Sequence, residues 1–385
     1  MDASEAVEAT ESGIIAPDAA GILHGGTALS VSDAATAATT DRQTFRWRSA
    51  PSSLLLAGAG FVVGTVGLAV MTDANGVHRT ACVLLGLFLL GRGLSGVGVL
   101  CVGPRFDLGL WLSGAWLVLL VLAAMFVDLL PVGEHRDTTA TLATPGNLRP
   151  DLFSSHPLGT NNFSLDLLAR CVYGARVSLL TALVAVVVGS LVGSVIGVIA
   201  GYCRGRVDTA IGVFTDGVLA FPALIMLVAL AAVIGIPKTV PEAILKSGVA
   251  LAALSIPAMV RLARANTLVQ AQQEFVLASR AMGARRSRVV LREIYPNVMM
   301  PILSYSFVVM AVLIVAEGSL SFLGLGLQAP EPTWGNMIAE GGVDALKRNP
   351  HVVLVPGAFI FLTVFSLNRV GEHARAAFAP AEAKL

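Results

Sequence analysis

Long apolar runs separated by short polar stretches make up most of this chain. Eight of these runs are long enough for a membrane-spanning helix, which needs roughly 17–25 residues. Backbone N–H and C=O groups in lipid must bond within their own segment, so each run predicts a helix. The predicted spans lie at about residues 53–71, 81–103, 109–130, 178–201, 209–236, 244–260, 298–316 and 352–370. The pattern predicts an all-α polytopic membrane protein.

Composition supports a membrane environment. The 385 residues are 55% hydrophobic and 13% charged, whereas soluble domains carry about 25% charged residues. The net charge is only +1, so no basic field indicates nucleic acid as a partner. The cysteines show no metal-binding spacing and are expected as small buried side chains; they are Cys82, Cys101, Cys171 and Cys203. Neither a disulfide framework nor a metal or other cofactor is expected.

The N-terminal segment differs from the rest of the chain. Residues 1–50 are rich in Ala, Thr and Ser and lack apolar periodicity, which predicts a disordered tail. No basic region leads directly into an apolar run there, so a cleaved signal peptide is not expected. Within the second predicted span, Arg92 would cost at least about 2.5–3.5 kcal/mol unless it faces protein or water.

The distribution of Lys and Arg predicts one orientation. Three arginines precede the first span, which places the N-terminus in the cytoplasm. Alternation then places three more basic segments on the same side, namely 202–208, 261–297 and the C-terminal tail. The opposite side receives segments of mixed charge, namely 131–177, 237–243 and 317–351. Both termini are therefore expected in the cytoplasm.

A ladder of glycines occupies one face of the predicted span 178–201. Small residues at four-residue spacing let a neighbouring helix backbone approach closely. The neighbour could belong to another subunit or to this chain, and the frequency of the pattern in membrane helices favours packing within the chain. The residues are Gly189, Gly193, Gly197 and Gly201.

The basic stretch Glu274–Asn297 interrupts two apolar runs. Its first part predicts a short helix with one face formed by Phe275, Ala278, Ser279 and Met282. Gly283 suits the left-handed position that ends such a helix. A second short helix is expected from Arg285 to Tyr295, with Pro296 stopping it before the next span.

Three functions are compatible with this stretch. It could be an amphipathic helix resting on anionic headgroups. It could be a positive topology anchor. It could also be a docking element that inserts into a groove on a cytoplasmic partner. The residue pattern by itself leaves all three open.

The stretch resembles the "EAA…G" cytoplasmic loop of permease subunits of binding-protein-dependent ABC importers. The matching residues are Glu274, Phe275, Val276, Ala278, Ser279, Gly283, Ile294, Pro296 and Asn297. Leu277 stands where the motif usually has Glu. The resemblance implies that the loop couples the permease to an ATPase subunit, through Glu274, Phe275, Ala278, Ser279, Met282 and Gly283.

Further motifs are similar to the C-type permease subunits of the peptide/nickel family. They are HPLGT at 156–160, YGARVSLL at 173–180, AGYCRGRVD at 200–208, DGVLAFP at 216–222 and AEGSLSFLGLGLQAPEPTWGNMIAEG at 316–341. Residues 161–165 depart from the pattern usual after the first motif. The similarity covers about residues 131–380 and leaves 1–104 outside.

The resemblance implies the transmembrane domain of a type I ABC importer. Six family-type helices are expected, with two extra N-terminal spans. The domain divisions are a tail at 1–50, the extra spans at 51–104, the first family helix and an extracytoplasmic segment at 105–172, and the type-1 domain at 173–376 with the coupling loop 261–297. An outer mouth is implied at Pro330, Pro332, Trp334 and Gly335, with Trp334 a candidate anchor at the lipid–water interface.

The family also implies the partners of this chain in a bacterial inner membrane. They are a second permease subunit, two ATP-binding subunits and an extracytoplasmic solute-binding protein. This chain would form half of the translocation path. Peptides are the leading substrates, with nickel chelates, glutathione or another small solute as alternatives.

Motifs for chemistry are absent from the sequence. No phosphate-binding G-x-x-x-x-G-K-[ST] loop occurs, so any ATP hydrolysis belongs to separate subunits and no catalytic residue is expected. His156 is interpreted as a turn residue, and Glu317 and Asp216 as structural before substrate-binding. The rival classes are a transporter or channel not coupled to an ATPase, which the scarcity of intramembrane acids disfavours, and a membrane scaffold.

Overall fold

We describe a computed structural model, which places residues 52–63, 65, 76–103, 106–141, 144–151 and 154–378. The predicted tail 1–50 lies outside these residues. The regular elements of the described part are helices, with one isolated bridge between Thr160 and Asp166. The chain folds as two compact units, Met1–Leu108 and Gly109–Leu385, and each is described by itself.

The first unit contains a helix at Ser52–Val63 and the helix α3 at Gly76–Val102. They pack through small residues, since a Cβ added at Gly60 would lie 2.7 Å from the carbonyl oxygen of Gly86. A Cβ at Gly93 would lie 2.6 Å from that of Ala57. α3 covers the second predicted span. The guanidinium of Arg92 is exposed and lies 5.9 Å from the ring centre of Phe88.

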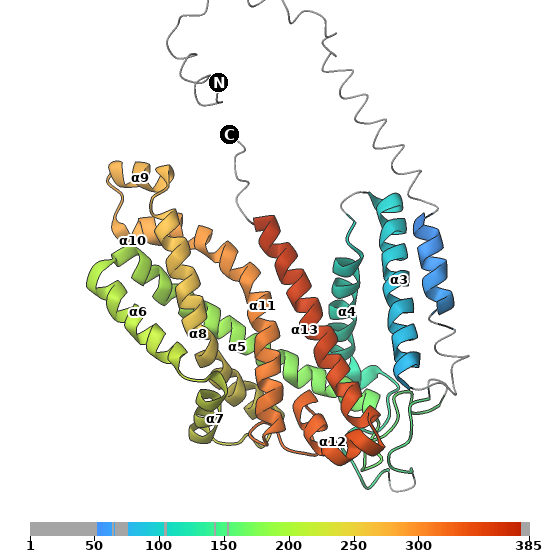
Figure 1. Ribbon diagram of the computed structural model, residues 1–385. Helices are drawn as coiled ribbons and strands as arrows, with labels where there is room; N and C mark the ends of the chain where they lie inside the picture. Colours follow the sequence, from blue (N-terminus) through green and yellow to red (C-terminus); the bar gives the residue numbers. More distant parts are fainter. Residues whose placement is uncertain are drawn as a thin grey trace, which may run out of the picture. The chain divides into compact units, whose positions relative to one another are not determined.

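The second unit is a bundle of long helices (Figure 1). Five described helical segments are long and apolar enough to cross a membrane, and a sixth span results if the bent pair α6–α7 counts as one. The elements are α4 Leu108–Met125, η3 Val127–Leu129, α5 Leu167–Cys203, α6 Gly205–Ala220, α7 Ala223–Ile234, α8 Val240–Gln270, α9 Glu274–Ala281, α10 Arg286–Arg288, η4 Val289–Ile294, α11 Tyr295–Phe322, α12 Trp334–Arg348 and α13 His351–Phe378. Five of the six family-type spans predicted from the sequence are thus present as long helices, and the sixth, 209–236, corresponds to the bent pair.

The helix α5 lies at the centre of this bundle and packs most extensively against α8. The four glycines of the ladder face α8. A Cβ at Gly193 would lie 2.5 Å from the Cβ of Met259, and one at Gly197 would lie 2.5 Å from the carbonyl oxygen of Val260. A Cβ added at Gly189 would likewise lie against Ser255, and one added at Gly201 would lie against Thr267. The close approach is therefore made within the chain.

One predicted span is broken. The run 209–236 forms α6 and α7, bent by 94° where Phe221 and Pro222 join them. A proline pushes the preceding residue out of the helical region, and Phe221 has extended angles of φ −76° and ψ 138°. Hydrophobicity alone did not predict this break, because the residues around it are as apolar as those within a helix.

The expected stop at Pro296 is wrong. The helix runs on from Arg286 to Phe322. Pro296 falls in the first turn of α11, directly after the π-helical turn η4. A proline removes one i→i−4 bond and its ring crowds the carbonyl four residues back, and the wider turn before it already departs from the i→i−4 pattern. The helix can therefore pass through this proline.

The burial expected of the cysteines holds for one of the three that can be assessed. Cys171 is buried, whereas Cys101 and Cys203 are exposed; the side chain of Cys82 lies outside the described ones. A thiol is a small, largely apolar group. On a helix that faces lipid, apolar character does not require burial within the protein.

Candidate coupling loop and charged helix pair

The loop after α8 is built around a sharp turn at Gly283. α9 ends at Ala281 with Met282 as its C-cap, and Gly283 has a φ of +82°. The N–H of Ala284 donates to the carbonyl of Ser279 at 3.1 Å, and the N–H of Gly283 donates to that of Arg280 at 3.0 Å. This bond pair defines a Schellman motif, which closes a helix with a left-handed residue. The elbow predicted at Gly283 is therefore present.

α9 presents an apolar exterior. Phe275, Leu277 and Ala278 are exposed, and Met282 has 81% of its surface accessible. Ser279, predicted on this face, is instead buried, because the Schellman turn folds the chain back over its carbonyl. Leu277 adds an apolar side chain to the exterior where the resembling motif has Glu.

The inner face of α9 fastens the loop to the bundle. Val276 is fully buried and belongs to the same core as Val289 and Ile294 of η4. The guanidinium of Arg280 lies 5.2 Å from the ring centre of Tyr202, near the end of α5. The loop is thus held by both α5 and the start of the following helix.

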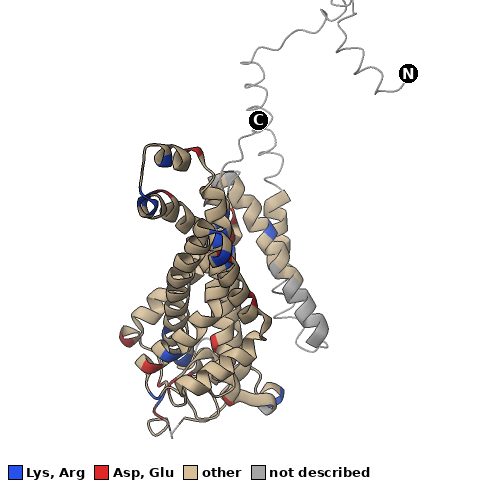
Figure 2. Ribbon diagram, turned by 90° about the vertical axis from the view of Figure 1, so that its left-hand side faces the viewer, with Lys and Arg blue, Asp and Glu red and all other residues tan. Residues whose placement is uncertain are grey.

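Arginines surround the exposed apolar side chains. Figure 2 shows basic residues along α9 and α10 at one end of the bundle. All of the following are exposed: Arg280, Arg285, Arg286, Arg288 and Arg292. This end combines an apolar tip with a basic surround, as predicted for the Glu274–Asn297 stretch.

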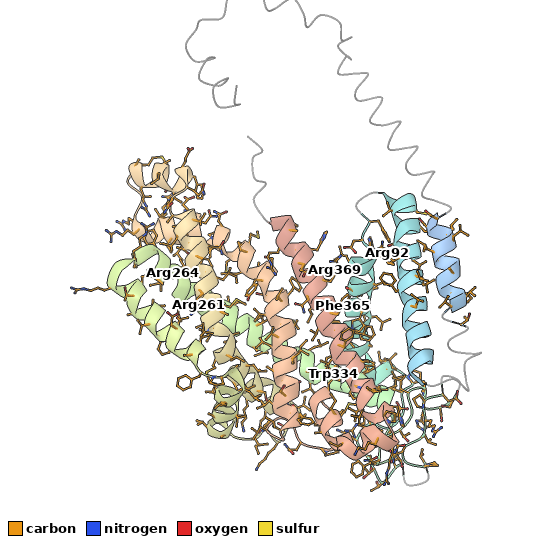
Figure 3. All side chains as sticks on the ribbon, viewed as in Figure 1. Arg92, Arg261, Arg264, Trp334, Phe365 and Arg369 are labelled. Atoms are coloured by element: carbon orange, nitrogen blue, oxygen red, sulfur yellow. The ribbon has the colours of Figure 1, made fainter. Side chains whose placement is uncertain are left out.

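The opposite end of the second unit carries α12 and the residues before α5 (Figure 1). The predicted interfacial position of Trp334 is wrong, because this side chain is fully buried. Its indole N–H donates to the carbonyl of Cys171 at 2.9 Å. The capping box of Thr333 and Asn336 starts α12 at this point and turns Trp334 inward. Figure 3 shows Trp334 within the bundle.

The other outer-mouth candidates divide into two groups. Pro332 is buried, and Gly335 packs against the carbonyl of Gly318 and the side chain of Ser321. Pro330, which follows a cis peptide bond, is exposed. Of the four candidates, only Pro330 thus lies on the surface.

Two buried charged residues, Asp166 and Arg170, fix the start of α5. Asp166 accepts from the N–H of Ala169 at 2.7 Å and lies 2.8 Å from Nδ1 of His156. Arg170 is 1% exposed and donates to both carboxylate oxygens of Glu340 at 2.8 and 2.9 Å. His156 therefore has a structural partner in its turn, and the described residues contain no cluster of metal-ligating side chains.

Residues 134–137 form a compact charged turn at this end. Backbone N–H groups of Arg136, Asp137 and His135 donate to Glu134 and hold the pKa of its carboxyl below the usual value. Burial lowers the pKa of His135, whose ring stacks on Tyr173 with centres 3.6 Å apart. The carboxylate and the neutral imidazole are therefore both favoured near neutral pH.

Charged side chains also lie on α6 and α8. Nη2 of Arg261 donates to Asp216 at 2.6 Å, and Arg264 makes a two-pronged contact with Asp208 through Nε and Nη2, the latter at 2.7 Å. Both arginines belong to the segment 261–297, whose basic residues predicted only its side of the membrane, so these pairs were not predicted. An aspartate inside the predicted span 209–236 was the available signal.

Glu317 of α11 has partners without charge. The hydroxyl of Ser178 donates to it at 2.8 Å and that of Ser321 at 2.7 Å. The side chain is buried between α5 and α11. These contacts agree with the structural role expected for Glu317.

Comparison with known proteins gives a consistent result. Residues 193–381 match the family described as binding-protein-dependent transport system inner membrane component. The chain is 32% identical over 260 residues to the dipeptide transport system permease protein DppC of Alkalihalophilus pseudofirmus, covering 68% of this chain and 82% of that protein. It is 38% identical over 225 residues to the glutathione transport system permease protein GsiD of Escherichia coli, covering 58% and 72%. The same values hold for GsiD of Shigella boydii.

The fold and these similarities define an integral inner-membrane transport component. The bundle of apolar helices, the elbowed loop and the family match all point to this class. The chain belongs to the binding-protein-dependent transport family, and within it to the permease subunits of ABC importers that resemble DppC and GsiD.

Proposed function

We propose that this chain is one of two permease subunits of an importer for small peptides and forms half of its translocation path. The apolar, elbowed tip of the loop carries this proposal, because a docking element needs exposed anchors on a rigid support. The relatives named for dipeptide and glutathione transport support a peptide as substrate.

The complete importer would contain a second permease, two ATP-binding subunits and an extracytoplasmic binding protein. The chain itself contains no phosphate-binding loop, so its partners would supply the ATPase. The loop end of the bundle would face the cytoplasm because its exposed residues are rich in arginine. The end with α12 and residues 131–166 would then face the binding protein.

Coupling would occur through α9. Phe275, Leu277 and Met282 would enter a groove on the ATP-binding subunit, while the surrounding arginines would contact its acidic rim. A ligand-driven change requires contacts that differ between two states. The support of α9 by α5 and η4 would transmit a displacement of the loop to the bundle.

The test replaces Gly283 by Val. A β-branched residue at positive φ costs on the order of 1–3 kcal/mol, although a Cβ there meets no atom within 4 Å. Gly283→Val should therefore leave the protein inserted and abundant, while it weakens recovery of the ATP-binding subunit or uncouples hydrolysis from uptake. Pull-down and uptake of a labelled dipeptide are measured at equal expression.

Arg285→Ala is the matched control on the same loop. A docking loop predicts a small effect, because Arg285 is exposed and its side chain sets no backbone geometry. A helix bound to headgroups predicts the reverse order, since positive charge would then dominate. Wild-type behaviour of Gly283→Val together with failure of Arg285→Ala would reject the coupling role. Competition by excess glutathione in the same uptake assay separates the two substrate classes.

A further inference from the structure

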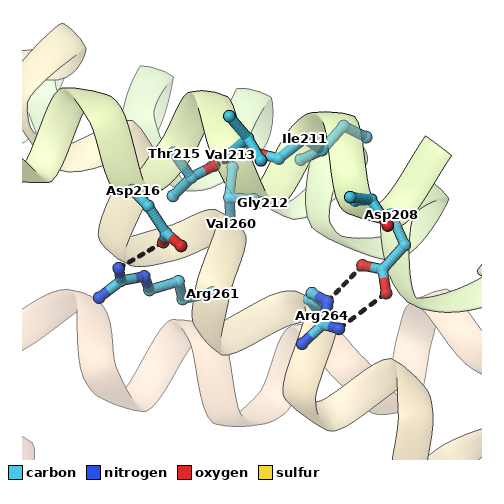
Figure 4. Close-up of a pocket in the computed structure, with 10 residues that line it drawn as sticks. Asp208, Ile211, Gly212, Val213, Thr215, Asp216, Val260, Arg261 and Arg264 are labelled. Carbon is cyan, nitrogen blue, oxygen red and sulfur yellow. Dashed lines mark hydrogen bonds and ion pairs between the residues drawn. The ribbon is translucent and has the colours of Figure 1, made fainter. Parts of the chain in front are cut away.

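A cavity of about 570 Å³ lies between α6 and α8, in the half of the bundle toward the coupling loop. Such a volume is within the range of pockets that hold small ligands, about 300–1,000 Å³. Two ion pairs line it, Asp208 with Arg264 and Asp216 with Arg261 (Figure 4). The cavity thus offers two negative and two positive groups and no net charge.

These charges lie in helices of a membrane protein. Charged groups in such helices face protein or water and mark candidate functional sites. The side chains of Arg261 and Asp216 are 57% and 66% exposed, so packing within the chain does not explain them. The Arg261–Asp216 pair is therefore open to the exterior of the chain and is not packed within it.

Both ion pairs leave capacity for a ligand. Arg261 bonds one carboxylate oxygen of Asp216, Oδ1, and so the other oxygen can accept from an ammonium group. Arg264 uses Nε and Nη2 on Asp208, which leaves Nη1 to donate to a carboxylate. A ligand with one charge of each sign can therefore bind without breaking either pair.

The spacing suits a short peptide. Asp208, which holds Arg264, lies eight residues before Asp216 on α6. This separation corresponds to about 12 Å along the helix axis. An extended tripeptide spans about 10 Å. Between the pairs the lining includes Gly212, where an added Cβ would meet no atom within 4 Å. The peptide backbone would have room beside Gly212.

We infer that this cavity is a binding site within the permease for short zwitterionic peptides, with the terminal ammonium on Asp216 and the terminal carboxylate on Arg264. The inference deepens the proposed function and rests on it. The permease would then select free peptide termini after release from the binding protein. Recognition of the termini leaves the side chains of the peptide free to vary.

The experiment uses the assembled importer without nucleotide and without binding protein. Equilibrium dialysis measures the binding of labelled trialanine, N-acetyl-trialanine and trialanine amide. Each blocked peptide should bind about tenfold or more weakly, since each loses one charge-assisted contact. Asp216→Asn should weaken trialanine and should abolish the preference over N-acetyl-trialanine, while the preference over the amide remains.

Two glycine-to-leucine variants test whether the cavity binds peptide or whether the ion pairs only hold α6 and α8 together. Gly212→Leu should fill the cavity and abolish trialanine binding without touching either ion pair. Gly217→Leu is the control, because a Cβ at Gly217 also meets no atom within 4 Å and this residue does not line the cavity. Equal loss in both variants, or binding retained in Gly212→Leu, would overturn the inference.

Uptake is then measured with the same preparations, reconstituted with the binding protein. This measurement distinguishes failure of the proposed binding site from failure of the proposed function. Peptide uptake by the wild type without measurable trialanine binding, or with equal binding of blocked and free peptides, rejects the site and leaves the peptide importer intact. Failure of the wild type to take up any peptide rejects the proposed function instead. Binding with the stated variant pattern supports the site.

Discussion

At the scale of single residues, several charged side chains in the helices of the second unit have polar partners. Arg170 meets Glu340, Arg176 meets Asp128 at 2.9 Å, and Glu317 accepts from two serine hydroxyls. A buried polar group without a partner costs free energy, and a buried charge costs more. These contacts allow a chain with few charged residues to keep several of them within or beside its spans.

The Arg170–Glu340 pair gives a prediction of stability. Glu340→Gln should lower the stability by about 3–5 kcal/mol, because Arg170 would remain as a buried charge without a counter-charge. Glu242→Gln removes the exposed partner of Lys246 and should lower the unfolding midpoint much less, because solvent screens an exposed ion pair. Thermal unfolding of the purified complexes measures both. Equal midpoints for Glu340→Gln and the wild type would contradict a stabilising role of the pair.

At the scale of elements, the glycine seam joins α5 and α8. Side chains larger than hydrogen would separate the two helices along four consecutive turns, since each glycine already lies against α8. Close packing tolerates little added volume. The seam therefore requires glycine for steric reasons, although all four residues have ordinary helical angles.

Gly197→Ala tests the seam. Its new Cβ would lie 2.5 Å from the carbonyl oxygen of Val260 and 2.6 Å from the Cβ of Ala263, so overpacking should cost about 1–3 kcal/mol. Gly114→Ala in α4 meets no atom within 4 Å and should raise stability slightly through helix propensity. Thermal unfolding and membrane abundance are compared. Similar behaviour of the two variants would show that the seam is looser than described.

The sequence predicted which segments are helical better than where they begin and end. The run 178–201 corresponds to α5, which begins eleven residues earlier at Leu167. Arg170 and Arg176 interrupt the apolar run, and their partners Glu340 and Asp128 are remote in sequence. Hydrophobicity cannot reveal that such charges are neutralised, because the neutralisation exists only after folding.

The candidate functional features likewise include one that local sequence predicts and one that it does not. The elbow at Gly283 follows from local chemistry, since a left-handed residue after a short helix favours glycine. The cavity between α6 and α8 depends on pairing between residues 45 and 56 positions apart. Its arginines also fit the positive-inside pattern, so membrane topology explained them without any reference to their ion pairs with α6.

At the scale of the whole molecule, the two ends of the second unit are expected on opposite sides of the membrane. Ser155 and Lys347 are exposed at the α12 end, and Ser287 is exposed beside the coupling loop. In a variant without the four native cysteines, Ser155→Cys and Lys347→Cys should react with an impermeant thiol reagent in intact cells. Ser287→Cys should react only after lysis. The inverse pattern would reverse the proposed orientation.

The seam between α5 and α8 also limits how the bundle can move. Helices packed closely along four turns resist sliding and bending relative to each other, so we expect them to move as one rigid unit. α5 has 37 residues, a length of about 55 Å. One end contacts the coupling loop through Tyr202, and the other is clamped by Asp166 and Arg170. We therefore expect a displacement at the loop end of α5 to tilt the α5–α8 pair as a unit.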